Sequence, residues 1–149
     1  MIERNGSIWD IGADAVVIPT NSGTNKDREA IMGKGVAKQA ADKYPYLAAT
    51  LGQDIYHHGV RVVHFPIPKG HNIIIFPTKT MWHMPAKIDL IESSAKALVT
   101  LVDFNVFGWT MIALPRVGCG EGKLKWPDVK AVLEPLLDDR FVVCSLYGH

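Results

Sequence analysis

The sequence predicts a three-layer α/β domain, in which helices cover both faces of one β-sheet. Short apolar runs alternate with segments of helical periodicity along the 149 residues, which is the order found in such domains. The apolar runs are nearly continuous, as expected for strands that are buried on both faces of a sheet. No repeat, low-complexity tract or linker divides the chain, so we expect a single domain over residues 1–149.

The first half of the chain contains a predicted strand, a helix and two further strands. Residues 14–19 form a short apolar run that leads into a polar loop, which indicates a buried strand. The apolar side chains of residues 35–44 fall on one helical face, and Pro45 ends this helix. Residues 61–65 and 72–76 are two more apolar runs, and the segment between them is rich in proline and glycine.

The second half of the chain continues the same alternation. Residues 86–104 repeat apolar side chains at intervals of three and four residues, which predicts a long helix. A strand over residues 110–114 then runs into a glycine-rich loop. Pro127 suits the first turn of another helix, which Pro135 ends or kinks. Residues 140–146 form the last predicted strand.

Composition and charge limit the function classes. Hydrophobic residues make up 48% and charged residues 21%, as in ordinary globular domains. The formal net charge of +1 argues against a nonspecific nucleic-acid binder, although a basic patch on one face remains compatible with it. Cys119 and Cys144 lack zinc-site and CxxC spacing, so we expect reduced thiols in a cytoplasmic protein. We expect no secretory signal in the first ten residues and no membrane span.

The first of three candidate ligand-binding segments follows the strand at residues 14–19. It begins with Thr20 and Asn21, continues through an insertion at residues 23–31, and ends in a glycine loop that enters a helix. Glycines let a backbone approach a ligand, and the start of a helix offers unpaired N–H groups to a phosphate. The residues of this glycine loop are Met32, Gly33, Lys34, Gly35 and Val36.

The other two segments follow the strands at residues 72–76 and 110–114. Thr78 and Lys79 come directly after the first of these strands, where ligands bind in sheets of this kind. The loop after the second strand alternates glycine with other residues and can form a nest of N–H groups around a diphosphate. It lacks the order of a Walker A loop and comprises Pro115, Arg116, Val117, Gly118, Cys119, Gly120, Glu121 and Gly122.

Each segment alone has an ordinary alternative. Either glycine loop is explained by a tight turn, and Lys79 by a solvated loop position. Two glycine loops that face one crevice are stronger evidence for a ligand site than either loop alone, because together they can hold a diphosphate from two sides. From the residues alone we therefore expect a phosphate-bearing small molecule, without a choice of which one.

In combination, the three segments resemble macro domains in order and spacing. The similarity extends from Gly6 to Tyr147 and depends on the Met-Gly-Lys-Gly and Arg-Val-Gly-Cys-Gly segments together. It is greatest to glycohydrolases that act on acyl-linked ADP-ribose, to antitoxins that remove ADP-ribose from DNA, and to small phage and bacterial macro-like proteins. The resemblance implies a three-layer α/β/α macro domain with a central mixed sheet, acting as a monomer in the cytoplasm.

The resemblance also implies roles for residues near the distal ribose of ADP-ribose. Asn21 matches the asparagine that holds the distal ribose hydroxyls. Residues 32–36 match the loop along the distal ribose and diphosphate, and residues 117–122 match the second diphosphate loop. Thr78 and Lys79 match a pair in the DNA-directed and acyl-directed enzymes, in which the lysine acts at the distal ribose. No cofactor or metal is implied.

At the adenine end, the resemblance is less complete. Ile8 matches a residue whose backbone faces adenine, and Tyr147 matches an aromatic residue that covers the ring. Ser7 stands where many macro domains have an aspartate beside adenine, and Gly122 stands where the acyl-directed enzymes carry one. The insertion at residues 23–31 enlarges the first loop, either as a lid or to contact a substrate group beyond the distal ribose.

Three functions follow from this resemblance. The first is hydrolysis at C1'' of an ADP-ribose conjugate, in which Asn21 orients the ribose, Lys79 attacks C1'' or stabilises the leaving group, and Glu121 carries a proton. The second is a phosphatase acting on ADP-ribose-1''-phosphate. The third is a module that binds ADP-ribose or a related nucleotide without turnover, which the missing aspartates favour.

The histidines add little to these hypotheses. His57 and His58 have no ligand partners at metal spacing, so we expect exposed loop residues. His83 follows Lys79 closely and is either a substrate contact or an ordinary loop histidine.

Overall fold

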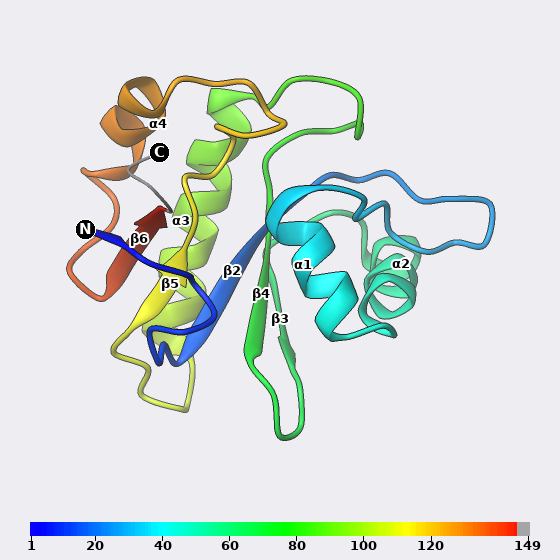
Figure 1. Cartoon of the computed structure of the whole chain (residues 1–149), viewed down its shortest axis with the longest axis horizontal. Helices are drawn as coiled ribbons and strands as arrows, with labels where there is room; N and C mark the ends of the chain where they lie inside the picture. Colours follow the sequence, from blue (N-terminus) through cyan, green and yellow to red (C-terminus); the bar gives the residue numbers. More distant parts are fainter. Residues whose placement is uncertain (146–149) are drawn as a thin grey trace.

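A computed structural model describes residues 1–145 and contains one mixed sheet with helices on both of its faces (Figure 1). The strand order is β1-β6-β5-β2-β4-β3. All neighbouring strands are parallel except β3 and β4, which are antiparallel. The strands are β1 (Ile2–Asn5), β2 (Ala15–Thr20), β3 (Val63–Pro66), β4 (Asn72–Pro77), β5 (Ile112–Leu114) and β6 (Phe141–Ser145).

The helices form two layers, α1 (Gly35–Lys43) with α2 (Leu47–His58) and α3 (Ile88–Phe104) with α4 (Trp126–Leu133) (Figure 1). Strand β2 shows how the sheet separates two cores. Val17 packs with the residues of α3 and α4, whereas Ile18, one position later, packs with those of α1 and α2. The three-layer arrangement and the burial of both sheet faces are therefore confirmed. No helix within residues 1–145 is long and apolar enough to cross a membrane.

All the predicted helices and strands are present, with bounds that differ by a few residues. Two elements lie outside the prediction. Strand β1 has four exposed residues and, within residues 1–145, pairs only with β6, so it carries no buried apolar run that would reveal it. Helix α2 buries only Leu47, Leu51 and Gly52, which is a weak apolar signal. The expectation that His57 and His58 lie in a loop is wrong, because they are the exposed last residues of α2.

The insertion at residues 23–31 is anchored on α2. The backbone N–H of Ala30 donates to the carbonyl of Ala48 at 2.8 Å, and the Arg28 guanidinium lies 4.7 Å from the centre of the Tyr56 ring. A Cβ atom built at Gly52 would overlap the carbonyl oxygen of Arg28 and lie 2.9 Å from its carbonyl carbon. The close approach of the insertion to the helix therefore depends on a residue without a side chain.

This packing predicts that Gly52→Ala destabilises the protein. Helix propensity alone would favour alanine by about 1 kcal/mol. The overlap with the Arg28 carbonyl is expected to reverse that sign, and overpacking of this kind typically costs about 1–3 kcal/mol. Urea unfolding measures the difference, with Gln53→Ala at the exposed next position of α2 as the control. A Gly52→Ala protein as stable as the wild type would contradict the anchoring.

Candidate functional site

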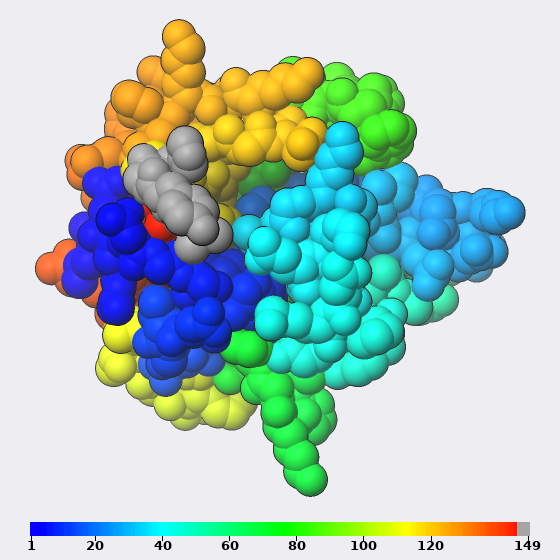
Figure 2. Space-filling model, in the orientation of Figure 1, coloured from blue at the N-terminus to red at the C-terminus, as the bar shows by residue number. Residues whose placement is uncertain are grey.

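The carboxyl ends of β2, β4 and β5 open into a cavity of about 790 Å³. Figure 2 shows the hollow between the cyan surface that begins α1 and the yellow-orange surface of the loop after β5. All three segments predicted to bind a ligand contribute to its lining. A volume of this size is in the range of cavities that bind nucleotide-sized molecules.

The first glycine loop ends at the start of α1, as predicted. Lys34 occupies the N-cap position in an extended conformation, and its side chain makes no capping hydrogen bond to the helix. The N–H groups of the first turn therefore remain available to an anion, together with the favourable end of the helix dipole. Met32, Gly33, Lys34, Gly35 and Val36 all line the cavity.

Asn21 lies at the base of the insertion and lines the cavity. Its side-chain oxygen accepts a hydrogen bond from the backbone N–H of Gly23 at 2.7 Å, and its amide nitrogen donates to the carbonyl of Ile31 at 3.2 Å. Asn21 thus joins the two ends of the insertion. An amide nitrogen has two hydrogens, so one of them remains for a ligand hydroxyl.

Thr20 and Thr78 extend the contact between β2 and β4 into the floor of the cavity. The backbone N–H of Thr78 donates to the carbonyl of Thr20 at 2.9 Å, and the Thr78 hydroxyl reaches the same oxygen at 3.4 Å. The hydroxyl of Thr20 is buried and has no hydrogen-bond partner within residues 1–145. A buried hydroxyl of this kind is a candidate donor or acceptor for a bound molecule or water.

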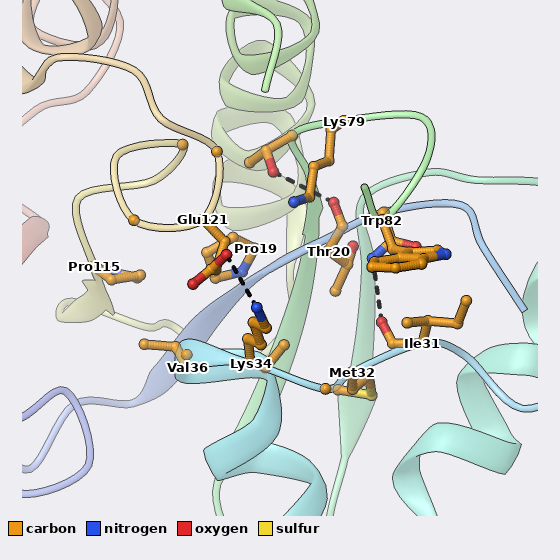
Figure 3. A pocket seen from close by; sticks show the side chains of 18 of the residues that line it. Pro19, Thr20, Ile31, Met32, Lys34, Val36, Lys79, Trp82, Pro115 and Glu121 are labelled. Atoms are coloured by element: carbon orange, nitrogen blue, oxygen red, sulfur yellow. Dashed lines mark hydrogen bonds and ion pairs between the residues drawn. The ribbon is translucent and has the colours of Figure 1, made fainter. Parts of the chain in front are cut away.

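Lys79 is half-buried, and its amine points into the cavity (Figure 3). The segment that carries it is well fixed, because Ser94 donates to the carbonyl of Pro77 at 2.7 Å and the N–H of Lys87 donates to the carbonyl of Thr78 at 2.9 Å. Among the described residues, no carboxylate forms an ion pair with Lys79. Its amine is therefore available to a ligand.

The loop after β5 folds back on itself, and its glycines allow this. A Cβ atom at Gly122 would lie 2.5 Å from the carbonyl oxygen of Gly118 and 2.7 Å from the Cβ of Ala86. No side chain fits at position 122 in this conformation. The loop packs in this way only with glycine at position 122. An aspartate there would therefore require a different conformation of the loop as well as a different side chain.

An ion pair joins the two glycine loops across the cavity. The Lys34 ammonium lies 3.7 Å from a carboxylate oxygen of Glu121, and the two side chains are 70% and 57% exposed (Figure 3). Exposed pairs of this kind contribute about 0–1 kcal/mol, so a phosphate can displace Glu121 from Lys34 at little cost.

The lining of the cavity is strongly basic although the chain is nearly neutral. Among residues 1–145, four cationic residues, Lys34, Lys79, Arg116 and Lys123, line it together with one carboxylate, that of Glu121. A concave site of one sign concentrates oppositely charged ligands. The cavity therefore suits a diphosphate.

Some predicted binding residues are not among those that line this cavity. Val117 is fully buried in the core beside α3, and Ile8 is buried beside α1 and α2. Ser7 accepts a hydrogen bond from the backbone N–H of Trp9 at 3.2 Å and does not line the cavity. The Cys119 side chain packs against the core rather than the cavity. Tyr147 lies outside the described residues.

Cys119 is also unsuited to act as a nucleophile. Burial raises the pKa of its thiol to about 11, and the nearby Arg116 guanidinium offsets this only in part. The thiol is therefore protonated at neutral pH, whereas the thiolate is the reactive form.

The sequence-based prediction missed part of the cavity wall. Trp82 and His83 both line it, whereas the sequence alone predicts no role for Trp82 and does not choose between a substrate contact and a loop position for His83. The polar and aromatic stretch after Lys79 was the available signal. Pro19, Ile31, Ala37, Pro115 and Lys123 complete the lining. Within residues 1–145, no group of three His, Cys, Asp or Glu side chains is arranged to hold a metal ion.

No family model matches the sequence. A protein from Thermus aquaticus named DNA ADP-ribosyl glycohydrolase is 30% identical over 146 residues, which cover 89% of this chain and 36% of the relative. A Mycobacterium tuberculosis protein of the same name is 30% identical over 107 residues, 67% of this chain and 30% of the relative. The chain thus spans about a third of the length of the curated relatives it matches.

Solved structures resemble the whole described fold. The macrodomain of Thermus aquaticus DarG has a TM-score of 0.79 and 26% identity, with coverage of 96% of this chain and 95% of that one. Thermosipho africanus DarTG in complex with ADP-ribose has a TM-score of 0.81 at 18% identity, with coverage of 97% of this chain and 41% of that one. This agreement confirms the predicted fold class.

The ion pair across the cavity predicts that Glu121→Gln strengthens the binding of a diphosphate. The change removes the carboxylate that competes for Lys34 and repels phosphate, so we expect the Kd for ADP to fall about two- to fivefold, in keeping with a surface ion pair. Calorimetry at low ionic strength measures this effect. Glu134→Gln is the control, since Glu134 is similarly exposed and pairs with Lys130 outside the cavity. Weaker ADP binding by Glu121→Gln would show that the carboxylate supports the ligand instead.

Proposed function

This chain belongs to the macro domain family, in the branch of the DarG macrodomains, and on that premise we propose that it binds ADP-ribose and hydrolyses the bond at C1'' of an ADP-ribose conjugate. The observation that carries the proposal is the meeting of Asn21, Lys79 and two glycine loops in one basic cavity.

In this proposal the diphosphate lies between the two glycine loops. The N–H groups at the start of α1 and the ammonium of Lys34 approach it from one side, and the loop at residues 118–122 approaches it from the other. The distal ribose then extends toward Asn21, whose remaining amide hydrogen faces a ribose hydroxyl. The ADP-ribose bound to Thermosipho africanus DarTG, a protein of similar fold, supports the choice of ligand.

Lys79 is the residue we propose to act at C1''. As a nucleophile, its amine would form a bond to C1'' while the bond to the leaving group breaks, and water would then release ADP-ribose and restore the amine. As a cation, it would instead stabilise the negative charge that develops on the leaving group while water attacks C1''. In both routes the leaving group takes up a proton, for which Glu121 is the candidate carrier.

We propose DNA-linked ADP-ribose as the first conjugate to test, because the curated relatives are named for that activity. We also propose that the chain acts as one domain, as a monomer, in the cytoplasm of a bacterial or phage-infected cell. The free thiols of Cys119 and Cys144 agree with that compartment.

A binding module without turnover is the second candidate. Gly122 favours it, because the close packing against Gly118 and Ala86 leaves no room for an acidic side chain there. A tight complex with ADP-ribose and no product from any conjugate would identify this function. Release of inorganic phosphate from ADP-ribose-1''-phosphate would instead identify a phosphatase.

Replacement of Lys79 distinguishes a role in the chemical step from a role in ligand binding. We expect Lys79→Ala to lower kcat on DNA-linked ADP-ribose by about 100-fold or more, as the loss of a group acting directly on the reacting bond typically does. The Kd for ADP-ribose should change little, because the glycine loops hold the diphosphate. Single-turnover assays and calorimetry measure the two quantities.

Lys123→Ala is the matched control for this prediction, because Lys123 is a second lysine of the cavity wall and is exposed. It should weaken ADP-ribose binding modestly and leave kcat near the wild-type value. Full turnover of every conjugate by Lys79→Ala would exclude the role proposed for this residue.

A further inference from the structure

Trp82 is a large aromatic residue exposed on the cavity wall. The residue is 52% exposed and lines the same cavity as Lys79. The other tryptophans have structural contacts. Trp109 is only 7% exposed, and the indole N–H groups of Trp9 and Trp126 donate to Gln39 and Glu3. Exposed aromatic surface inside a cavity is typical of a binding contact.

The indole is held in place from one side. A Cβ atom built at Gly23 would lie 3.7 Å from Cδ1 of Trp82 and 3.1 Å from Cδ1 of Ile31, so both side chains lie over the first loop. Figure 3 shows the ring between Ile31 and the part of the cavity that contains Lys79. The His83 ring makes an edge contact with the indole, with the ring centroids 5.3 Å apart, and about half of the residue remains exposed to a ligand.

The backbone around Trp82 is also fixed. The N–H of Ser22 donates to the carbonyl of Thr80 at 3.0 Å, and the Ser22 hydroxyl donates to the same oxygen. The N–H of Met84 donates to the carbonyl of Met81 at 3.1 Å, which closes a turn around Trp82. An aromatic ring held in this way loses little conformational entropy when a planar group stacks on it.

From this arrangement we propose that Trp82 is a specificity-determining residue that stacks against a nucleobase of the DNA strand to which ADP-ribose is attached. The inference rests on the proposed function, because the base that Trp82 would contact belongs to the group bonded to C1'' of the bound ADP-ribose. A base extending from C1'' past Lys79 would meet the exposed part of the indole in the same cavity. Lys79 and Lys123, which line the same cavity, would supply positive charge to the phosphates of the strand.

A nucleobase fits this wall better than a peptide side chain does. Stacking on an aromatic residue beside cationic groups is the usual way in which proteins hold single-stranded nucleic acid. An ester-linked acidic side chain of a peptide offers no ring to the indole. A peptide conjugate should therefore bind with an affinity that does not depend on Trp82.

The test measures equilibrium binding in the Lys79→Ala background, so that turnover does not interfere. The ligands are an oligonucleotide carrying ADP-ribose on a base, a peptide carrying it on a glutamate, and free ADP-ribose. Trp82→Ala should weaken binding of the oligonucleotide about tenfold, within the range for loss of base stacking. Trp82→Phe should restore most of the affinity. Binding of the peptide and of ADP-ribose should change less than about twofold.

Met81→Ala is the control, because Met81 is 43% exposed next to Trp82 but does not line the cavity. Equal losses for all three ligands would mean that Trp82 only shapes the pocket, and would overturn the proposal. Loss for the peptide alone, or for no ligand, would overturn it as well. Absence of turnover in the wild-type protein would contradict the proposed hydrolysis. The comparison of binding affinities would still decide the role of Trp82, because it does not depend on turnover.

Discussion

The parallel pairing of β2 with β4 is the constraint on which the site depends. Thr20 lies opposite Pro77 at the end of this ladder, and the N–H of Thr78 adds one more bond to the carbonyl of Thr20 at 2.9 Å. Because the two strands end at the same edge of the sheet, the residues that follow them, Asn21 and Lys79, enter one cavity. Any change in the register of this pair would separate the two residues on which the chemistry is proposed to depend.

Loop packing then completes the cavity around that edge. The insertion is held by α2, and Ser22, which precedes it, is held by the Thr80 carbonyl. The loop after β5 closes on Gly118 and brings Glu121 toward Lys34. Both loops are therefore fixed largely by backbone contacts, while the ion pair between them is weak and exposed. This combination gives a preformed cavity in which ligand phosphates have one weak interaction to displace.

Much of this arrangement could be predicted from the sequence because apolar periodicity reflects burial. Strands β2 and β4 are buried on both faces and were visible as continuous apolar runs, whereas the exposed β1 was not. Within a loop, the sequence alone could not distinguish the residues that line the cavity from their neighbours that face the core. Val117 and Cys119 face the core beside glycines that line the cavity, and Trp82 became recognisable only through its position on the wall. Likewise, the packing that excludes a side chain at Gly122 depends on Ala86, 36 positions earlier in the chain.

Calorimetric titration with ADP-ribose tests the central claim most directly, with AMP and NAD as comparison ligands. The account predicts one site of micromolar affinity for ADP-ribose and at least about tenfold weaker binding of AMP, which lacks the second phosphate and the distal ribose, a difference of about 1.4 kcal/mol. NAD carries a planar nicotinamide at C1'', the position that the site leaves to the conjugated group, so its affinity relative to that of ADP-ribose measures how readily this side of the cavity admits a ring. No binding of ADP-ribose, or equal affinity for AMP, would contradict the assignment of the cavity to the diphosphate and distal ribose.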